Sequence, residues 1–387
     1  MRIVHIVASA PYNDNWGYQD NLLPHFHCRL GHEVSVIVCN LKQEGGKIVE
    51  TPCGRYFLDD GVEVIRLEKE KIIGRRVTQI LSKLPVRRYL EELKPDMIFS
   101  HGLLSSTILT AIRYRKRCNP SCVLVQDTHL DYFNCYKTGS LTDKVLRIYY
   151  RLLNRYSQKY MSCIFGVTPW RMTYAEDYFR IRPERLKLLV MGGDDDQIRF
   201  SEQAAIRRKL REENRLADDD FVIVSGGKID RKKHILELMQ AVSELDEQKL
   251  HLLVFGDASS ELDAEFQRLA EHDRIHAVGW VPAEQTYDYF LAADLAVFPG
   301  THSVLWEQAC ACGIPCFFKD WEGMHHVDVG GNCLFLQEGT VEELKQKLME
   351  VLDRRSVYCA MKQAAVQKGI DIFSYRRIAQ RVIDEAK

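Results

Sequence analysis

The sequence lacks the patterns that mark several common classes of protein. No apolar run approaches the roughly 18 residues that a helix needs to cross a bilayer. Neither a Gly-x-Gly-x-x-Gly nor a Gly-x4-Gly-Lys-Ser/Thr motif occurs, which disfavours a nicotinamide-dependent dehydrogenase and a P-loop nucleoside triphosphatase. The first residues, Met1 to Ala10, form a strand-like run instead of a signal peptide, so we expect folding to begin there.

Cysteines are numerous, but none form a Cys-x-x-Cys pair. The nearest groups, Cys118/Cys122 and Cys310/Cys312/Cys316, have no histidines at zinc-finger spacing. Cys310 and Cys312 alternate with alanines, which favours small core residues on a packed helix over metal ligands. The pattern predicts buried thiols in a reduced, cytoplasmic compartment and no metal site.

Length and charge indicate two dissimilar halves. At 387 residues the chain exceeds what one hydrophobic core usually organises, so two domains are expected. Residues 1–193 carry 29 Lys and Arg against 19 Asp and Glu, whereas residues 194–387 carry 24 against 35. We expect the first half to face an acidic partner, such as an anionic membrane or a phosphorylated acceptor. No recognisable nucleic-acid module accompanies the charge, so nucleic acid is not expected.

Short apolar runs alternate with helical patterns along both halves. Ile3–Val7 is followed by a Gly-containing loop and a helix that Gly31 ends as a C-cap, before a second run at Val34–Val38. This βαβ unit predicts a parallel sheet with helices on both faces. Further strands are expected at Val62–Leu67, Met97–Ser100, Cys122–Gln126, Ile164–Val167, Phe221–Ser225, Leu250–Phe255, Ile275–Val278, Leu295–Phe298 and Cys316–Phe318.

The alternation breaks at Leu188–Phe200, where Met-Gly-Gly-Asp-Asp-Asp predicts a turn-rich connection. We therefore expect an α/β protein with two Rossmann-like domains, 1–193 and 194–387, and a last helix that can cross back to the first domain. Two such sheets facing each other would place the carboxyl ends of their strands around one cleft, where ligands of open sheets bind.

A basic loop with two glycines follows the strand at Phe221–Ser225 and precedes a helix at Ile235–Leu245. Gly227 would let the backbone approach a phosphate closely, while Lys228 and Lys233 would supply positive charge to a departing diphosphate. On these residues alone, a solvated basic loop is an equally good interpretation.

A second segment, Asp294–Pro315, ends a strand at Pro299 and places Glu307 at the start of a small-residue helix. A carboxylate there is suited to accept two hydrogen bonds from a ribose diol. The alternative is a carboxylate that interacts with the helix dipole in the first turn, and without neighbouring motifs that alternative is favoured.

Taken in order, these segments resemble family four of the retaining glycosyltransferases, which have the GT-B fold. A lysine, Lys228, stands where that family has arginine. The matching motifs extend over nearly the full length: Gly31–Val34, Thr128-His129, Met191–Asp194 with Phe200, Gly227-Lys228 with Lys233, Phe255–Asp257, Val278–Val281, and Glu307 with Gly313 and Pro315. The resemblance implies a metal-independent, retaining hexosyl- or related glycosyltransferase whose co-substrate is a nucleotide-sugar and which needs no other cofactor.

One departure concerns the donor sugar. The family carries Glu-x7-Glu, with the first acid near the sugar and the second on the ribose, but Pro299 stands eight positions before Glu307. His302 and Ser303 then become the polar candidates to contact the sugar, and the alternative for His302 is a plain loop histidine. The departure leaves the identity of the donor open.

The resemblance assigns further donor-binding residues. In the second half these are Gly227, Trp280 and Val281. In the first half, the loop containing Gly17 would lie against the donor phosphates, and its glycine is otherwise a simple turn residue.

Two histidines follow strands of the first half. His129 comes after Cys122–Gln126 and His101 after Met97–Ser100, so both are expected at the edge of the cleft. The resemblance implies that His129 reaches the donor sugar. Each is alternatively a structural histidine with satisfied hydrogen bonds, and for His101 that interpretation is favoured.

A basic amphipathic helix is expected in the first half, able to lie on anionic headgroups. Its basic residues recur at helical spacing beside an apolar set: Lys144, Arg147, Arg151, Arg155 and Lys159, with Val145, Ile148, Tyr149, Leu152 and Tyr156. Further basic clusters of this half are Arg75/Arg76, Arg87/Arg88 and Arg113–Arg117. The alternative is a helix that packs one face on its own domain.

The expected function is transfer of a sugar, with retention, from a UDP-, GDP- or ADP-sugar to a glycan or lipid-linked acceptor. Cell-surface polysaccharide assembly at the inner face of the membrane fits this expectation by analogy. Two alternatives remain, a nucleotide-sugar epimerase of the same architecture and a non-catalytic nucleotide-sugar-binding protein. The sequence does not name the base, the sugar or the acceptor.

Overall fold

The computed structural model describes residues 1–71, 81–135 and 141–386. Its contacts divide the chain into two compact units, the first comprising Met1–Val190 with Ile378–Lys387 and the second Met191–Arg377. Helix α15, Tyr375–Ala386, carries the chain from the second unit back to the first. The predicted boundary, after residue 193, is close to the passage between Val190 and Met191.

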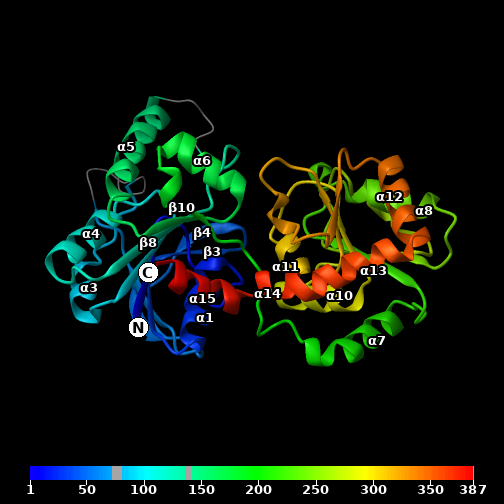
Figure 1. Cartoon of the computed structure of the whole chain (residues 1–387), viewed down its shortest axis with the longest axis horizontal. Helices are drawn as coiled ribbons and strands as arrows, with labels where there is room; N and C mark the ends of the chain where they lie inside the picture. Colours follow the sequence, from blue (N-terminus) through cyan, green and yellow to red (C-terminus); the bar gives the residue numbers. More distant parts are fainter. Residues whose placement is uncertain (72–80, 136–140, 387) are drawn as a thin grey trace. The chain divides into compact units, whose positions relative to one another are not determined.

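The first unit is built on an eight-stranded sheet in the order β10-β9-β8-β7-β1-β2-β6-β5 (Figure 1). A separate two-stranded hairpin, β3-β4, follows β2 in the chain. The strands are β1 Arg2–Val7, β2 Glu33–Cys39, β3 Leu41–Glu44, β4 Lys47–Glu50, β5 Gly54–Phe57, β6 Glu63–Leu67, β7 Met97–His101, β8 Val123–Thr128, β9 Cys163–Gly166 and β10 Leu186–Leu188.

The strands predicted for this sheet pair parallel, as expected, but a further strand that was not predicted, β5, pairs antiparallel with β6 at one edge. The two strands are joined by a tight turn in which Leu58 accepts a hydrogen bond from Gly61, whose φ is +89°. A connection this short permits only an antiparallel pair, since a parallel crossover needs about a dozen residues or more.

Helices cover both faces of this sheet, as buried parallel strands require. On one face α1 and α15 lie side by side, linked by a hydrogen bond between His27 and the carbonyl of Ala379 (Figure 1). Besides α15, the α-helices of this unit within the described residues are α1 Gln19–Arg29, α3 Arg87–Leu93, α4 Ile108–Arg117, α5 Leu141–Ser157 and α6 Pro169–Phe179.

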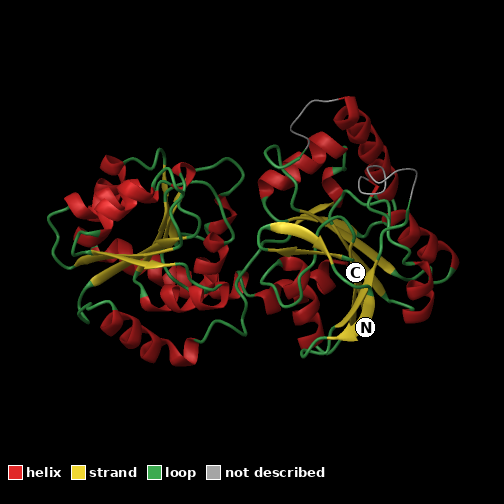
Figure 2. Cartoon of the chain, turned by 180° about the vertical axis from the view of Figure 1, so that it is seen from behind, coloured by secondary structure: helices red, strands yellow, loops and turns green. Residues whose placement is uncertain are grey.

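The second unit has a parallel six-stranded sheet in the order β13-β12-β11-β14-β15-β16, with helices on both of its faces (Figure 2). Its strands are β11 Phe221–Gly226, β12 Leu250–Phe255, β13 Ile275–Gly279, β14 Leu295–Phe298, β15 Cys316–Lys319 and β16 Cys333–Leu336. Its helices are α7 Gln203–Glu213, α8 Ile235–Glu244, α9 Asp263–Ala270, α10 Thr286–Ala292, α11 Leu305–Ala311, α12 Val341–Asp353, α13 Arg355–Ala364 and α14 Ile370–Ile372.

The α/β class with two Rossmann-like domains is thus confirmed, and the predicted strands are present with small differences at their ends. Among the parallel strands of each sheet, the strand order reverses at one place, between β1 and β7 in the first unit and between β11 and β14 in the second. Ligands of open α/β sheets bind at the carboxyl ends of the strands at such a switch point. Within the described residues, no helix is both long and apolar enough to span a bilayer.

Candidate functional site

Three loops meet at the carboxyl edge of the second sheet, following β11, β12 and β14. Glycines allow them to approach closely. A Cβ on Gly256, whose φ is +109°, would lie 1.9 Å from the carbonyl oxygen of Gly227, and a Cβ on Gly300 would lie 2.2 Å from that of Lys232. The Gly-Gly and Phe-Gly-Asp motifs after β11 and β12 are therefore packing requirements of this edge.

Lys233 joins the loops on the two sides of the switch point. Its Nζ donates to the carbonyl oxygens of Thr301 at 2.6 Å and His302 at 3.3 Å. Burial lowers the pKa of this lysine, and the nearby Asp230 offsets part of the effect. An ammonium group carries three donors, and these two contacts fix the β14 loop against the β11 loop.

Three predicted donor-binding residues and the predicted catalytic residue Lys228 line one pocket of about 410 Å³. Gly227 and Lys228 come from the loop after β11, and Trp280 and Val281 follow β13. Lys228 has a side chain that is 75% exposed, and Trp280 is also exposed. The pocket wall therefore presents the ammonium group of Lys228, the backbone of Gly227, which a ligand can approach closely, and the aromatic ring of Trp280. Leu305, in the first turn of α11, completes the lining near Gly227.

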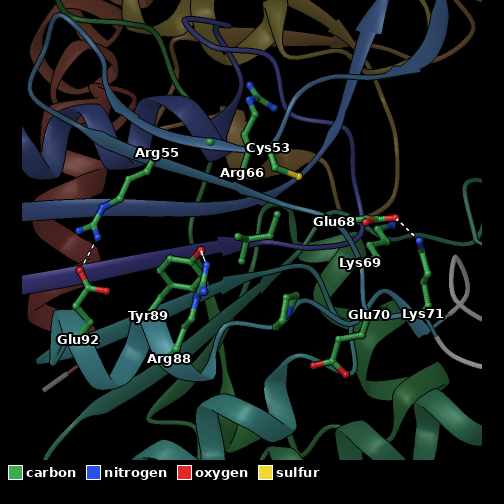
Figure 3. A pocket seen from close by; sticks show the side chains of 13 residues that line it. Cys53, Arg55, Arg66, Glu68, Lys69, Glu70, Lys71, Arg88, Tyr89 and Glu92 are labelled. Carbon is green, nitrogen blue, oxygen red and sulfur yellow. Dashed lines mark hydrogen bonds and ion pairs between the residues drawn. The ribbon is translucent and has the colours of Figure 1, made fainter.

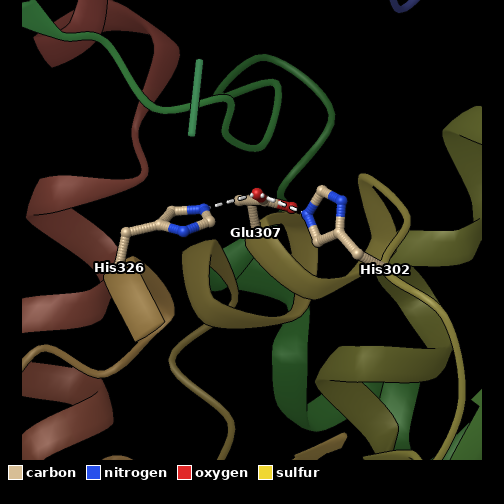
Figure 4. Close-up of side chains that lie close together, drawn as sticks. All are labelled: His302, Glu307 and His326. Carbon is tan, nitrogen blue, oxygen red and sulfur yellow. Dashed lines mark hydrogen bonds and ion pairs between the residues drawn. The ribbon is translucent and has the colours of Figure 1, made fainter. Parts of the chain in front are cut away.

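Glu307 is fully buried at the start of α11, and two histidines point at it from different segments (Figure 4). His302 Nε2, from the β14 loop, and His326 Nε2, from the helical turn His325–Val327, each lie 2.9 Å from Oε1 of Glu307. Burial opposes ionisation, but His302 and then His326 outweigh it and lower the pKa of Glu307 to about 2. The group is thus a buried carboxylate, and among the described residues its Oε2 has no hydrogen-bond partner.

The same three side chains have the chemistry of a metal site, since their ligand atoms lie within 4.8 Å of one another and two histidines with a glutamate bind zinc in some enzymes. Two neutral imidazoles that donate to one oxygen account for the contacts equally well. Two atoms of this cluster, Oε2 of Glu307 and Nδ1 of His326, have no hydrogen-bond partner among the described residues. Neither atom takes part in the two hydrogen bonds that join the three side chains.

In the first unit, Asp127 is the centre of a polar group at the carboxyl ends of β7 and β8. Its Oδ1 accepts from the backbone N–H of Gly102 at 2.7 Å, and its Oδ2 accepts from Gln19 Nε2 at 3.2 Å. His101 Nδ1 is 3.0 Å and His129 Nε2 3.6 Å from Oδ2. Burial opposes ionisation of Asp127, but His101 and His129 outweigh it and hold its pKa well below the ordinary value.

The two histidines of this group differ in exposure. The side chain of His129 is 41% exposed, whereas that of His101 is buried. The structural interpretation of His101 is therefore favoured by its surroundings, and His129 remains open to a ligand. Gly17 lies in an exposed loop between β1 and α1, and nothing within 4 Å would meet a Cβ there.

A larger pocket of about 920 Å³ lies along β5, β6 and α3 of the first unit (Figure 3). No sequence motif predicted it. Its lining carries both basic and acidic side chains, and two ion pairs lie within it, Arg55 with Glu92 and Lys71 with Glu68 (Figure 3). This pairing gives the pocket no single charge that would select a ligand.

Comparisons with known proteins bear on the second unit directly. Residues 206–368 match the family model of the glycosyl transferases group 1. The matched segment lies within the second unit and contains Lys228, Lys233, Trp280 and Glu307. No curated protein sequence matches the chain.

Solved structures share the fold over the whole length. A glycosyltransferase from Rickettsia africae is 13% identical, with a TM-score of 0.69 over 100% of this chain and 97% of its own. The HepE protein of Anabaena, in complex with UDP and glucose, is 15% identical, with a TM-score of 0.63 over 99% and 98%. A Listeria monocytogenes protein described as a UDP-N-acetylglucosamine 2-epimerase is 13% identical, with a TM-score of 0.59 over 99% and 94%. At such identities the likeness shows the fold and leaves the reaction open.

The structure thus brings Gly227, Lys228, Trp280 and Val281 together in one pocket. Glu307 is fully buried two residues after the lining residue Leu305 and does not itself line the pocket. His302 contacts Glu307, while Ser303 lies partly exposed on the same loop. Sequence reasoning missed His326. The residue stands 19 positions after Glu307, and no local pattern around it signals the contact.

Proposed function

We propose that the protein is a retaining glycosyltransferase of family four, which transfers a hexosyl or related group from a nucleotide-sugar bound by the second unit. The observation that carries the proposal is the pocket that unites Gly227, Lys228, Trp280 and Val281 at the switch point of a segment matching glycosyl transferases group 1. HepE, whose structure holds UDP and glucose, makes UDP-sugars the first donors to test.

Each feature of the site has a role in this proposal. Lys228, Lys233 and the glycine-lined backbone neutralise the diphosphate, a task that a bound cation would otherwise perform, so the reaction needs no metal and no further cofactor. Glu307 accepts hydrogen bonds from the ribose hydroxyls through Oε2. Because Glu307 is fully buried, donor binding must uncover this oxygen. His302 and Ser303 line the approach to the sugar.

The chemistry is a substitution at the anomeric carbon. The bond from this carbon to the diphosphate oxygen breaks, and a bond to the acceptor hydroxyl oxygen forms on the same face. The proton of the hydroxyl moves to the departing phosphate, whose charge the lysines stabilise. This course retains configuration without an enzymatic nucleophile, unlike the double displacement of retaining glycosidases.

The proposal is tested first by donor binding. UDP-, GDP- and ADP-sugars are screened by thermal shift and calorimetry, with and without a chelator. We expect stabilisation by one donor that resists the chelator, that Glu307→Ala abolishes, and that Glu265→Ala, on the exposed face of α9, leaves unchanged. If none of the donors stabilises the protein or gives a binding signal, the proposal is wrong.

Turnover separates the proposal from its two alternatives. An epimerase is favoured if the donor, incubated without acceptor, returns as an epimerised nucleotide-sugar, and the fold of the Listeria protein keeps this alternative open. A non-catalytic binding protein is favoured if a donor binds but no acceptor in a panel of glycans and lipid-linked sugars is modified.

We also propose that the first unit binds the acceptor and rests on an anionic membrane through α5. At about 100° per residue, five apolar side chains of this helix share one stripe, and they are between 42% and 79% exposed. They are Leu141, Val145, Ile148, Leu152 and Tyr156. Lys144 and Arg155 border the stripe and are exposed, as expected for an interfacial helix.

Two predicted basic residues of α5 have structural contacts instead. Arg147 donates to the hydroxyl of Tyr178, and Arg151 donates to its carbonyl. The predicted cluster Arg75/Arg76 lies outside the described residues. The membrane proposal therefore rests on the stripe and on its bordering charges, and it places the enzyme at the cytoplasmic face, in assembly of a cell-surface polysaccharide.

Vesicle flotation tests this surface. The protein should float with phosphatidylglycerol vesicles at low salt and not with phosphatidylcholine vesicles. Ile148→Glu should abolish flotation, whereas Val366→Glu, at a site of the second unit that is 47% exposed, should not. Absence of binding to anionic vesicles at low salt would end the membrane proposal and leave the donor proposal intact.

A further inference from the structure

Three buried histidines of the first unit form a continuous chain of hydrogen bonds. His27 Nε2 is 3.1 Å from the carbonyl oxygen of Ala379, and His27 Nδ1 is 3.0 Å from His5 Nε2. His5 Nδ1 is 3.0 Å from His101 Nε2, and His101 Nδ1 is 3.0 Å from Asp127 Oδ2. We call this chain, from Ala379 to Asp127, the histidine array.

The ends of the array decide the direction of its bonds. A carbonyl oxygen only accepts, so His27 must donate through Nε2. If His27 is neutral, its Nδ1 accepts from His5, and a neutral His5 in turn accepts from His101. His101 Nε2 therefore carries a proton, and the other nitrogen of that ring faces Asp127. An ionised carboxylate can only accept, so it requires a second proton on the His101 ring.

With Asp127 ionised, the array thus needs one proton more than three neutral imidazoles supply. Four hydrogen bonds require four protons, whereas three neutral imidazoles provide three. Two histidine groups of the second unit differ from the array, because neutral histidines supply all the protons that their hydrogen bonds need. His302 and His326 supply the two protons for their two bonds to Glu307, and His251 and His276 likewise suffice for their contacts.

The charge of Asp127 gives an independent reason for the extra proton. This carboxylate is fully buried, and an uncompensated charge in the interior carries a large desolvation cost. Burial, with the neighbouring histidines, holds the pKa of His5 well below the ordinary value, and burial lowers that of His27 to about 3. The proton consequently rests at the Asp127 end, on the ring nearest the carboxylate.

We propose that the histidine array stores one proton as a buried ion pair of His101 and Asp127, with His5 and His27 as neutral Nε2–H tautomers, and that this pair sets the orientation of His129. With Asp127 ionised, His129 directs Nε2–H towards it and keeps its Nδ1 lone pair for a ligand.

Other groups around the array are consistent with this assignment. Asp20, at the start of α1, is affected by His101 and His129, and burial raises its pKa. His32, after α1, interacts with His27. Gln19 and the backbone of Gly102 donate to Asp127, which stabilises the ionised carboxylate. His101, His129 and Asp127 thus lie at or next to the carboxyl ends of β7 and β8, whereas His5 lies within the central strand β1.

Nitrogen-15 NMR of histidine-labelled, deuterated protein tests the array without donor or acceptor. A histidine of ordinary pKa, about 6.5, is only about 3% protonated at pH 8. We expect one imidazolium signal at pH 8, absent from His101→Gln, together with two neutral Nε2–H tautomers. Wild-type protein with every histidine neutral at pH 8 would overturn the proposal, whatever the variants do.

Asp127→Asn provides the matched variant. Its amide donates to His101 Nδ1, so four bonds are filled by neutral groups and the imidazolium signal should vanish while the fold remains. Persistence of the signal in a folded Asp127→Asn protein contradicts the ion pair. The spectroscopic readout does not depend on activity, so the two proposals can fail separately. If the imidazolium signal is present but the protein has no transferase activity, only the proposed function is wrong. If the enzyme is active but the signal is absent, only this inference is wrong.

Discussion

The two units use the same kinds of residue, buried histidines with one carboxylate, in different arrangements. In the first unit, His5, His27 and His101 donate one after another along a chain that ends on Asp127. In the second, His302 and His326 donate side by side to one oxygen of Glu307. The arrangement of the hydrogen bonds determines the net charge of each group. The chain holds an extra proton and is neutral as a whole, whereas the pair leaves a net negative carboxylate with a free Oε2.

The comparison teaches that each arrangement suits a different task. A neutral, fully bonded chain fixes the positions of its members and tolerates burial. A carboxylate held by donors on one oxygen keeps the other as an acceptor for a ligand.

Removing the carboxylate should destabilise the first unit strongly. Asp127→Ala leaves the extra proton of the array without its partner, and breaking a buried ion pair in this way costs about 3–5 kcal/mol in the free energy of unfolding. Urea unfolding followed by circular dichroism measures it. Asp127→Asn serves as the control with a much smaller loss, and equal losses in the two variants would contradict the ion pair.

Acid should weaken the first unit through His5 and His27. Their pKa values are lower in the folded protein than the ordinary value of about 6.5, so between about pH 6 and 4 the unfolded chain binds more protons than the native one. The free energy of unfolding therefore falls as the pH falls, by up to about 2.7 kcal/mol per pH unit for two groups. Urea unfolding over this range, compared with a His5→Gln/His27→Gln protein, should show a steeper dependence in the wild type.

Changing Glu307 to an amide should affect the ligand more than the fold. In Glu307→Gln the side-chain oxygen can still accept from His302 and His326, but an amide donor replaces Oε2. Loss of the acceptor for a ribose diol should weaken UDP binding about 10- to 100-fold, which corresponds to about 1.4–2.8 kcal/mol. Calorimetry with Glu265→Gln as control measures this, and unchanged affinity would mean that Glu307 does not contact the nucleotide.

Altering one of the two histidines of the second unit should have the smallest effect. His302→Gln keeps a donor for Glu307, and His326 keeps the other, so the free energy of unfolding should change by about 1 kcal/mol or less. UDP affinity should change less than in Glu307→Gln. If His302→Gln binds UDP as weakly as Glu307→Gln, then His302 contacts the donor itself. Added zinc that blocks UDP binding to the wild type, but not to this variant, would favour the metal interpretation of the cluster.

The strands and the candidate site differ in how well the sequence predicted them. Apolar runs located the central strands of both sheets, because burial on both faces leaves a continuous apolar signal. The strands β10 and β16, of three and four residues, were missed because short, partly exposed segments carry little periodicity. The contact of His302 with Glu307 was not predicted, although the two are only five positions apart.

By itself the sequence determined the α/β class, since strand burial is a local property. The loop after β11 and Glu307 became site candidates only through the family resemblance of the motifs taken together, because each motif alone fitted a structural role equally well or better. Only the tertiary structure decided which titratable groups meet. His5 lies 22 positions from His27 and 96 from His101, and His27 meets a carbonyl 352 positions away. The protonation of a buried histidine depends on the partners at both ring nitrogens, and the sheet register and the returning last helix supply those partners.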